Sequence, residues 1–259
     1  MPEKNFAIIV ASLRARNGKT LLARLIADYF LLTGDKPEIF DTDAVERKLA
    51  GFFPELSTVI DLDRVPDQMK LFDTLQAALP ATQVIDVTHR SFQKFFKLMR
   101  DIDYAAEARS RGIEPVIFYI PDRDPESYEQ GRLLRERCKD CSFVLVENAF
   151  VGEIGKDTRR STAYAAFKSH NLRMTLPQLD PFFTSMIEDP KLSLSDFMRP
   201  VPAERPARMP SAQLSLAHLS REAGDGIRLW LKDVFKNLKW VMDELKLRGE
   251  SMEIEDASR

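Results

Sequence analysis

The sequence predicts an α/β protein, in which a mostly parallel sheet carries helices on both faces and a C-terminal helical extension follows. Short apolar runs, rich in β-branched residues, alternate along the chain with longer amphipathic segments. Runs that are apolar throughout are typical of strands covered on both faces. Strict alternation of strand and helix implies parallel strands joined by right-handed crossovers, because each helix must carry the chain back along the sheet.

Length and composition restrict the class of protein further. A chain of 259 residues with 44% hydrophobic and 30% charged residues can form a large globular core. Its net charge of -2 excludes a strong overall attraction to nucleic acid or anionic membranes. The sequence shows neither a signal-peptide pattern nor an apolar run near the roughly 18 residues of a membrane span. We therefore expect a cytoplasmic protein.

The stretch from Phe6 to Leu32 predicts a buried strand, a tight loop and an amphipathic helix in direct succession. The loop ends in Gly18-Lys19-Thr20. A helix N-terminus presents unpaired N–H groups and a partial positive charge, so this arrangement favours phosphate binding. Lys19 would then reach the terminal phosphates and the Thr20 hydroxyl would hold Mg²⁺. The alternative is a plain strand-to-helix turn with a surface lysine, because Leu13 stands where the full motif has glycine.

The remaining elements follow in alternation, and Gly34 ends the first helix as a C-terminal cap. Further strands are expected at residues 37–40, 59–62, 82–87, 114–120, 143–147 and 172–176. Helices are expected at residues 45–53, 67–79, 92–109, 125–139, 159–169 and 177–187. The resulting domain is predicted to span residues 1–198.

The composition changes at residues 199–210, where four prolines predict a semi-stiff extended connector. Its Arg199, Arg205 and Arg208 leave a modest nucleic-acid patch open, although solvated linker charge is the simpler interpretation. Residues 211–259 form the predicted C-terminal segment, largely helical up to Leu247 and interrupted near two glycines, Gly224 and Gly226.

Three aspartates follow predicted strands at the edge where α/β sheets bind ligands. Asp86 ends a buried strand and is placed to support a magnesium ion, with helix capping as the alternative. Asp41 and Asp43 close the second strand, and one of them could orient an attacking water molecule. Both are equally suitable as helix caps.

Taken in order, these motifs resemble the ParA/MinD group of P-loop ATPases, which have a SIMIBI-like fold. That group carries a deviant loop, Lys-Gly-Gly-x-Gly-Lys-Thr, which corresponds to Arg14-Ala15-Arg16-Asn17-Gly18-Lys19-Thr20. The resemblance continues through Asp41 and Asp43, Asp86, Asn148 and Pro177, and it covers about residues 5–190. Arg14 replaces the signature lysine, and Ala15 and Arg16 replace two glycines of the loop.

The resemblance implies a role for each matching position. Residues 16–21 (Arg16, Asn17, Gly18, Lys19, Thr20 and Leu21) would bind the phosphates of ATP, while Asn148 and Pro177 would contact the adenine. Thr20 and Asp86 would hold Mg²⁺. The catalytic residues would be Lys19, Asp43 and Arg14, with Asp43 positioning the water molecule. Arg14 would act on the nucleotide of a second subunit, because arginine keeps the charge of the signature lysine and binds phosphate oxygens bidentately.

The resemblance also implies a function. It predicts slow ATP hydrolysis by an ATP-dependent homodimer that a partner or adaptor protein stimulates and that partitions or positions a cargo. The resemblance leaves open whether non-specific DNA is the matrix that such a protein binds. Two alternatives remain: a pseudo-ATPase scaffold with impaired hydrolysis, and a small-molecule kinase or ligase on the same sheet.

Two further features lie outside these motifs. The helix within residues 227–247 carries an apolar stripe together with Asp233, Asp243 and Glu244, which favours docking or dimerisation and disfavours binding to anionic lipid. Cys138 and Cys141 form a Cys-x-x-Cys pair, which could hold a metal only across a dimer.

Overall fold

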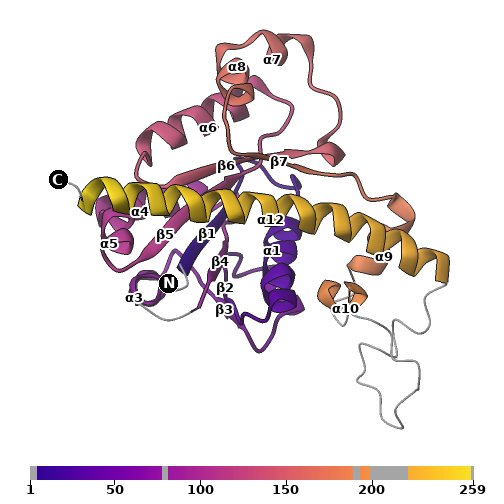
Figure 1. Ribbon diagram of the computed structural model, residues 1–259, viewed down its shortest axis with the longest axis horizontal. Coiled ribbons are helices and arrows are strands. Elements are labelled where there is room, and N and C mark those ends of the chain that lie inside the picture. Colours follow the sequence, from indigo (N-terminus) through magenta and orange to yellow (C-terminus); the bar gives the residue numbers. More distant parts are fainter. Residues whose placement is uncertain (1–4, 78–80, 189–192, 199–220, 258–259) are drawn as a thin grey trace.

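The computed structural model describes residues 5–77, 81–188, 193–198 and 221–257. Their strands form one sheet, in the order β3-β2-β4-β1-β5-β6-β7, and every neighbouring pair is parallel (Figure 1). The strands are β1 (Asn5–Ala11), β2 (Glu38–Asp41), β3 (Ser57–Val59), β4 (Gln83–Asp86), β5 (Ile113–Tyr119), β6 (Ser142–Asn148) and β7 (Arg173–Leu176). The predicted fold class is confirmed.

The central strand, β1, shows how the sheet separates two apolar cores. Phe6, Ile8 and Val10 face one core, whereas Ala7 and Ile9 face the other. All five side chains are at most 1% exposed, because helices cover both faces of a parallel sheet. This burial explains why the strand has no polar alternation in the sequence.

Helices are divided between the two faces. The first core is covered by α1 (Lys19–Thr33), α2 (Lys48–Phe52), α9 (Pro181–Ile187), α10 (Leu194–Met198) and α12 (Arg221–Ala257). The second core is covered by α3 (Val65–Gln76), α4 (Phe92–Asp101), α5 (Tyr104–Ser110), α6 (Pro125–Arg137) and α8 (Thr162–Lys168). The 3₁₀ turn η1 (Ala149–Val151) and α7 (Lys156–Arg160) follow β6.

The long helix α12 lies across the sheet on the same face as α1 (Figure 1). Its apolar stripe includes Ile227, Leu231 and Val234, which are fully buried in the core that α1 also lines. The Trp230 indole donates a hydrogen bond of 2.8 Å to the Pro177 carbonyl. The stripe therefore packs on its own domain over these residues. The predicted connector lies outside the described residues, so the domain boundaries stay predictions.

Two helices that the sequence predicts as single are each broken in two. The helix predicted at 92–109 is interrupted between α4 and α5, where Asp103 adopts a left-handed conformation with φ of 49°. The helix predicted at 159–169 is α7 followed by α8, because the Ser161 hydroxyl accepts a hydrogen bond from the Tyr164 N–H and starts a new helix. Neither break has a glycine or proline to indicate it.

The interruption predicted near Gly224 and Gly226 is wrong, since α12 runs through both. Gly226 has a packing role: a Cβ atom there would lie 2.6 Å from two ring atoms of Phe183 in α9. The glycine lets the two helices approach closely. Within the ranges described, no helix has the length and hydrophobicity needed to cross a membrane.

Candidate functional site

The candidate site lies at the carboxyl edge of the sheet, where β1, β2 and β4 end together. In the register of the strands, Asp86 is the partner of both Val10 and Asp41. The Thr42 backbone N–H and hydroxyl both donate to the Asp86 carbonyl, at 3.1 and 3.0 Å. These bonds hold the ends of β2 and β4 side by side.

The loop of residues 12–18, which we call the phosphate loop after its predicted role, joins β1 to α1 and is held by side-chain amides. Asn17 donates to the Ser12 hydroxyl at 2.8 Å, and Asn148, at the end of β6, donates to the Asn17 carbonyl at 3.0 Å. Arg16 and Gly18 have positive φ angles of 61° and 86°. Of the two glycine replacements, Arg16 therefore takes up the left-handed conformation, whereas Ala15 does not.

Gly18→Ala is expected to destabilise the protein more than Gly34→Ala does. Both glycines have positive φ, which costs a residue with a Cβ about 1 kcal/mol. A Cβ on Gly18 would also lie 2.6 Å from the Asn148 amide nitrogen, whereas a Cβ on Gly34 meets nothing within 4 Å. Urea unfolding of both variants measures the difference. Equal losses would show that the Asn148 side chain moves away freely.

The start of α1 offers unpaired backbone donors. Gly18 is the N-cap, no side chain caps the helix, and the first intrahelical bond runs from the Leu22 N–H to the Gly18 carbonyl at 2.8 Å. The N–H groups of residues 18–21 therefore have no acceptor within the helix. Together with the helix dipole, these donors suit an anion such as a phosphate group. Gly18, Lys19, Thr20 and Leu21, all predicted phosphate ligands, supply them.

The Lys19 side chain lies over the phosphate loop. Its ammonium group donates to the Arg14 carbonyl at 2.7 Å, and the residue is 7% exposed. Burial lowers the pKa of Lys19, and the nearby Asp86 carboxylate partly offsets this effect. A buried ammonium with one neutral partner can form a strong, charge-assisted bond to an anion that enters the loop.

Thr20 and Asp86, the predicted magnesium ligands, are in direct contact. The Thr20 hydroxyl donates to Asp86 Oδ2 at 2.6 Å. Asp86 Oδ1 is buried and has no hydrogen-bond partner in the described part of the chain. Burial, opposed by the Thr20 hydrogen bond, raises the pKa of Asp86 to about 7.

This pair of residues fits a divalent cation. The buried oxygen Oδ1 of Asp86 has no partner among the described residues, and a cation would be one. The neighbouring Thr20 hydroxyl can supply a second oxygen ligand. Among the described residues, no group of three or more His, Cys, Asp or Glu side chains could hold a metal. Mg²⁺ takes one or two protein ligands and completes its shell with phosphate oxygens and water, so the two residues Thr20 and Asp86 are compatible with it.

Asp41 and Asp43 act as caps within their own turn. Asp41 accepts the backbone N–H groups of Asp43 and Ala50, at 2.9 and 3.0 Å. Asp43 Oδ1 accepts those of Val45 and Glu46, at 3.1 and 3.0 Å. Asp43 thus holds the turn that precedes α2, and only Asp41 binds an N–H group of that helix, whose N-cap is Arg47. Asp43 as the residue that positions water stays a prediction.

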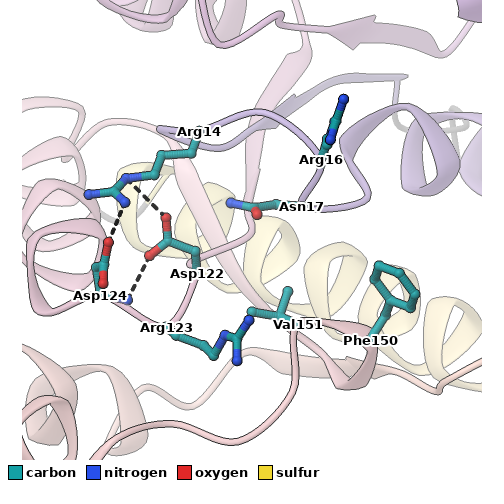
Figure 2. Close-up of a pocket in the computed structure, with 8 residues that line it drawn as sticks. All are labelled: Arg14, Arg16, Asn17, Asp122, Arg123, Asp124, Phe150 and Val151. Atoms are coloured by element: carbon teal, nitrogen blue, oxygen red, sulfur yellow. Dashed lines mark hydrogen bonds and ion pairs between the residues drawn. The ribbon is translucent and has the colours of Figure 1, made fainter.

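Arg14 is bound by carboxylates of its own chain (Figure 2). The guanidinium lies 3.3 Å from Asp122, 3.0 Å from Glu126 and in close contact with Asp124. We call these three residues the acidic triad. Sequence reasoning missed them, although the run Asp122-Arg123-Asp124-Pro125-Glu126 directly after a buried strand places three acids at the same sheet edge as the loop.

A pocket of about 450 Å³ opens beside the phosphate loop (Figure 2). It is lined by residues of the loop (Arg14, Arg16 and Asn17), of the turn after β5 (Asp122, Arg123 and Asp124) and of η1 (Phe150 and Val151). The Phe150 side chain is 65% exposed. Lys19, Thr20 and Asp86 do not line this pocket.

The two predicted adenine contacts already have partners. The Asn148 amide donates to Asn17 and accepts from the Phe150 N–H at 3.0 Å. The Pro177 carbonyl accepts from Trp230. Their role in binding adenine stays a prediction.

Cys138 and Cys141 are buried in the second core and are not bonded to each other. Burial is the main cause that raises the pKa of both thiols, which disfavours the thiolate needed for metal binding or redox chemistry. In this structure the two cysteines are packing residues of the second core.

Comparison with known proteins yields matches to solved structures only. No protein-family model and no curated protein matches the chain. It is similar to a nucleotide-binding protein from Archaeoglobus fulgidus in complex with ADP, with 12% identity and a TM-score of 0.45 over 76% of this chain and 89% of that chain. It is also similar to the MinC:MinD cell division protein complex of Aquifex aeolicus, with 15% identity and a TM-score of 0.36 over 78% and 98%. At these identities and TM-scores, neither similarity assigns a ligand or an activity to this chain.

Proposed function

We propose that this protein is a weak ATPase that binds Mg-ATP at the phosphate loop, dimerises with ATP bound and hydrolyses it slowly. The observation that carries the proposal is the convergence of three groups at one sheet edge. These are the unpaired N–H groups that begin α1, the buried Lys19 ammonium, and the Thr20–Asp86 pair with its unpartnered carboxylate oxygen. This set matches an anion and a divalent cation bound together.

Each residue has a distinct task in this proposal. The N–H groups of residues 18–21 bind phosphate oxygens, and Lys19 exchanges the Arg14 carbonyl for a phosphate oxygen. Thr20 and Asp86 hold Mg²⁺, which when bound neutralises charge on the phosphates. Asp43 orients the attacking water once it releases one of its two backbone partners. A polyphosphate supplies the negative charge that the N–H groups and the Lys19 ammonium would bind.

The biological role that we propose follows the order of motifs in the sequence. A protein that dimerises with ATP and dissociates after hydrolysis can partition or position a cargo, with a partner protein that stimulates hydrolysis. Arg14 would act on the nucleotide of the second subunit after leaving the acidic triad. Non-specific DNA is one matrix compatible with this role.

One observation favours a second candidate, a pseudo-ATPase scaffold. Both residues proposed to assist hydrolysis are engaged elsewhere: Arg14 by the acidic triad and Asp43 by the turn that it caps. In that case nucleotide binds but is not turned over. The measurement of phosphate release below separates the two candidates.

Lys19→Ala is expected to weaken ATP binding by about tenfold to a hundredfold, because a charge-assisted hydrogen bond to phosphate contributes about 1.5–3 kcal/mol. Calorimetric titration with Mg-ATP measures the affinity, and Lys36→Ala, an exposed lysine beyond the C-terminus of α1, is the matched control. A wild-type protein that binds no ATP would end the proposal. Phosphate release that Asp43→Ala abolishes supports the ATPase, whereas tight binding without release supports the scaffold.

A further inference from the structure

We infer that the pocket beside the phosphate loop is the nucleobase subsite, with Phe150 as the aromatic platform on which the base stacks. The inference rests on the proposed function, since it assigns the part of the nucleotide that lies beyond the phosphates. It differs from the expectation that Asn148 and Pro177 make the main contacts to the base. Three observations support it.

The first observation is that the predicted adenine contacts are used to hold the protein together. Both ends of the Asn148 amide have a protein partner, Asn17 on one side and the Phe150 N–H on the other. The amide also lies against the loop, because a Cβ on Gly18 would be 2.6 Å from its nitrogen. Trp230 binds the Pro177 carbonyl. Asn148 therefore fixes the loop and the turn after β6 in one arrangement.

The second observation is the position of Phe150. The Asn148 side chain caps η1 through the Phe150 N–H, so the backbone that carries the ring is held against the loop. The ring is 65% exposed and lines the pocket (Figure 2). A large, exposed aromatic side chain on a backbone that is held in place suits stacking on a planar ligand.

The third observation is the composition and size of the pocket. A volume of about 450 Å³ is within the range of small-molecule sites. The three carboxylates of the acidic triad exceed the charge of Arg14 by two, and Arg16 and Arg123, which form no ion pair with the described residues, offset these two negative charges. One aromatic face, two arginines and the loop amide form a surface for a base with an anionic tail. Because Arg16 and Asn17 belong to both the pocket and the loop, a single nucleotide can reach both.

The test compares two probes, Mg-ATP and inorganic triphosphate, which carries the phosphates without a base. Phe150→Ala is expected to weaken ATP binding about tenfold and to leave triphosphate binding unchanged, because base stacking on an aromatic ring is lost only for ATP. Phe150→Tyr, which keeps the stacking face, should bind ATP within about twofold of the wild type. Phe182→Ala is the matched control, since Phe182 is 63% exposed and does not line the pocket.

The outcomes separate this inference from the proposed function. An ATP affinity of Phe150→Ala within twofold of the wild type overturns the base subsite, and so does an equal loss for ATP and triphosphate, which indicates a distorted loop. In either case, triphosphate binding that Lys19→Ala weakens leaves the proposed function intact. A wild type that binds neither probe overturns both.

Discussion

The free energy of unfolding of the metal-free protein is expected to fall by about 4 kcal/mol through Asp86 alone as the pH rises from 4 to 8. Burial raises the pKa of Asp86 to about 7, whereas an unfolded aspartate titrates near 4. Between these values the folded chain retains a proton that the unfolded chain has lost, so raising the pH favours unfolding. Each pKa unit corresponds to about 1.4 kcal/mol, and three units give the stated size.

Asp86→Asn is the control for this prediction, because it removes the titration and keeps an oxygen for the Thr20 hydroxyl. Urea unfolding of both proteins at several pH values between 4 and 8 gives the contribution of Asp86 as the difference between the two curves. Subtraction is necessary because burial also raises the pKa of Asp28 and Asp41. Parallel curves would contradict the prediction.

The same titration should control magnesium. A cation binds the carboxylate and not the carboxylic acid, so at the metal site that we propose protons would compete with Mg²⁺ for Asp86. The affinity for Mg²⁺ in the presence of nucleotide is therefore expected to fall about tenfold for each pH unit below 7. An affinity that is constant from pH 7 to pH 5 would indicate that Asp86 is already ionised in the folded protein.

Asp28→Ala is expected to destabilise the protein by about 3–5 kcal/mol. Asp28 and Arg24 are buried in α1 as an i, i+4 pair at 3.8 Å. Asp28 also accepts the Ser195 N–H at 3.0 Å and the Ser193 hydroxyl at 2.8 Å. Removing Asp28 takes away the carboxylate that pairs with the buried Arg24 and leaves the Ser195 N–H and the Ser193 hydroxyl without this acceptor, and losses of this size are typical of a broken buried pair. Chemical unfolding of the wild type and the variant measures the change.

A double variant separates charge from packing at this position. Arg24→Met combined with Asp28→Leu replaces both ions with apolar side chains and is expected to recover most of the stability, because the two charges of the pair are removed together. The Arg24 guanidinium also lies 3.8 Å from the centroid of the Phe52 ring, where methionine can pack. A loss below about 1 kcal/mol for Asp28→Ala would show that water reaches Arg24.

Much of the fold could be predicted because its signals are local. An apolar run such as that of β1 needs cover on both faces wherever it lies, and Gly34 caps α1 as expected. The breaks at Asp103 and Ser161 could not be predicted, because neither residue rules out helix and tertiary packing selects the break. The packing role of Gly226 within α12 could not be predicted either, because it involves a ring distant in the sequence, Phe183.

The candidate site divides in the same way. Lys19, Thr20 and Asp86 are predicted to act together. Thr20 and Asp86 lie in hydrogen-bond contact because the parallel register of β1 and β4 brings their strand ends to one edge, whereas the Lys19 ammonium binds the Arg14 carbonyl. The partners of Arg14 come from a turn more than a hundred residues later in the sequence. No pattern in the loop itself indicates them. Such pairings depend on which strand becomes the neighbour of β1.

The replacement of loop glycines has a consequence for the thermodynamics of binding. Arg16 keeps the left-handed backbone that glycine would adopt freely, and the Asn17–Ser12 and Asn148–Asn17 hydrogen bonds hold it in place. A loop that is rigid before its ligand arrives loses little conformational entropy on association. Compared with a glycine-rich loop, this loop is preorganised and not adaptable, so we expect it to select among ligands by their shape.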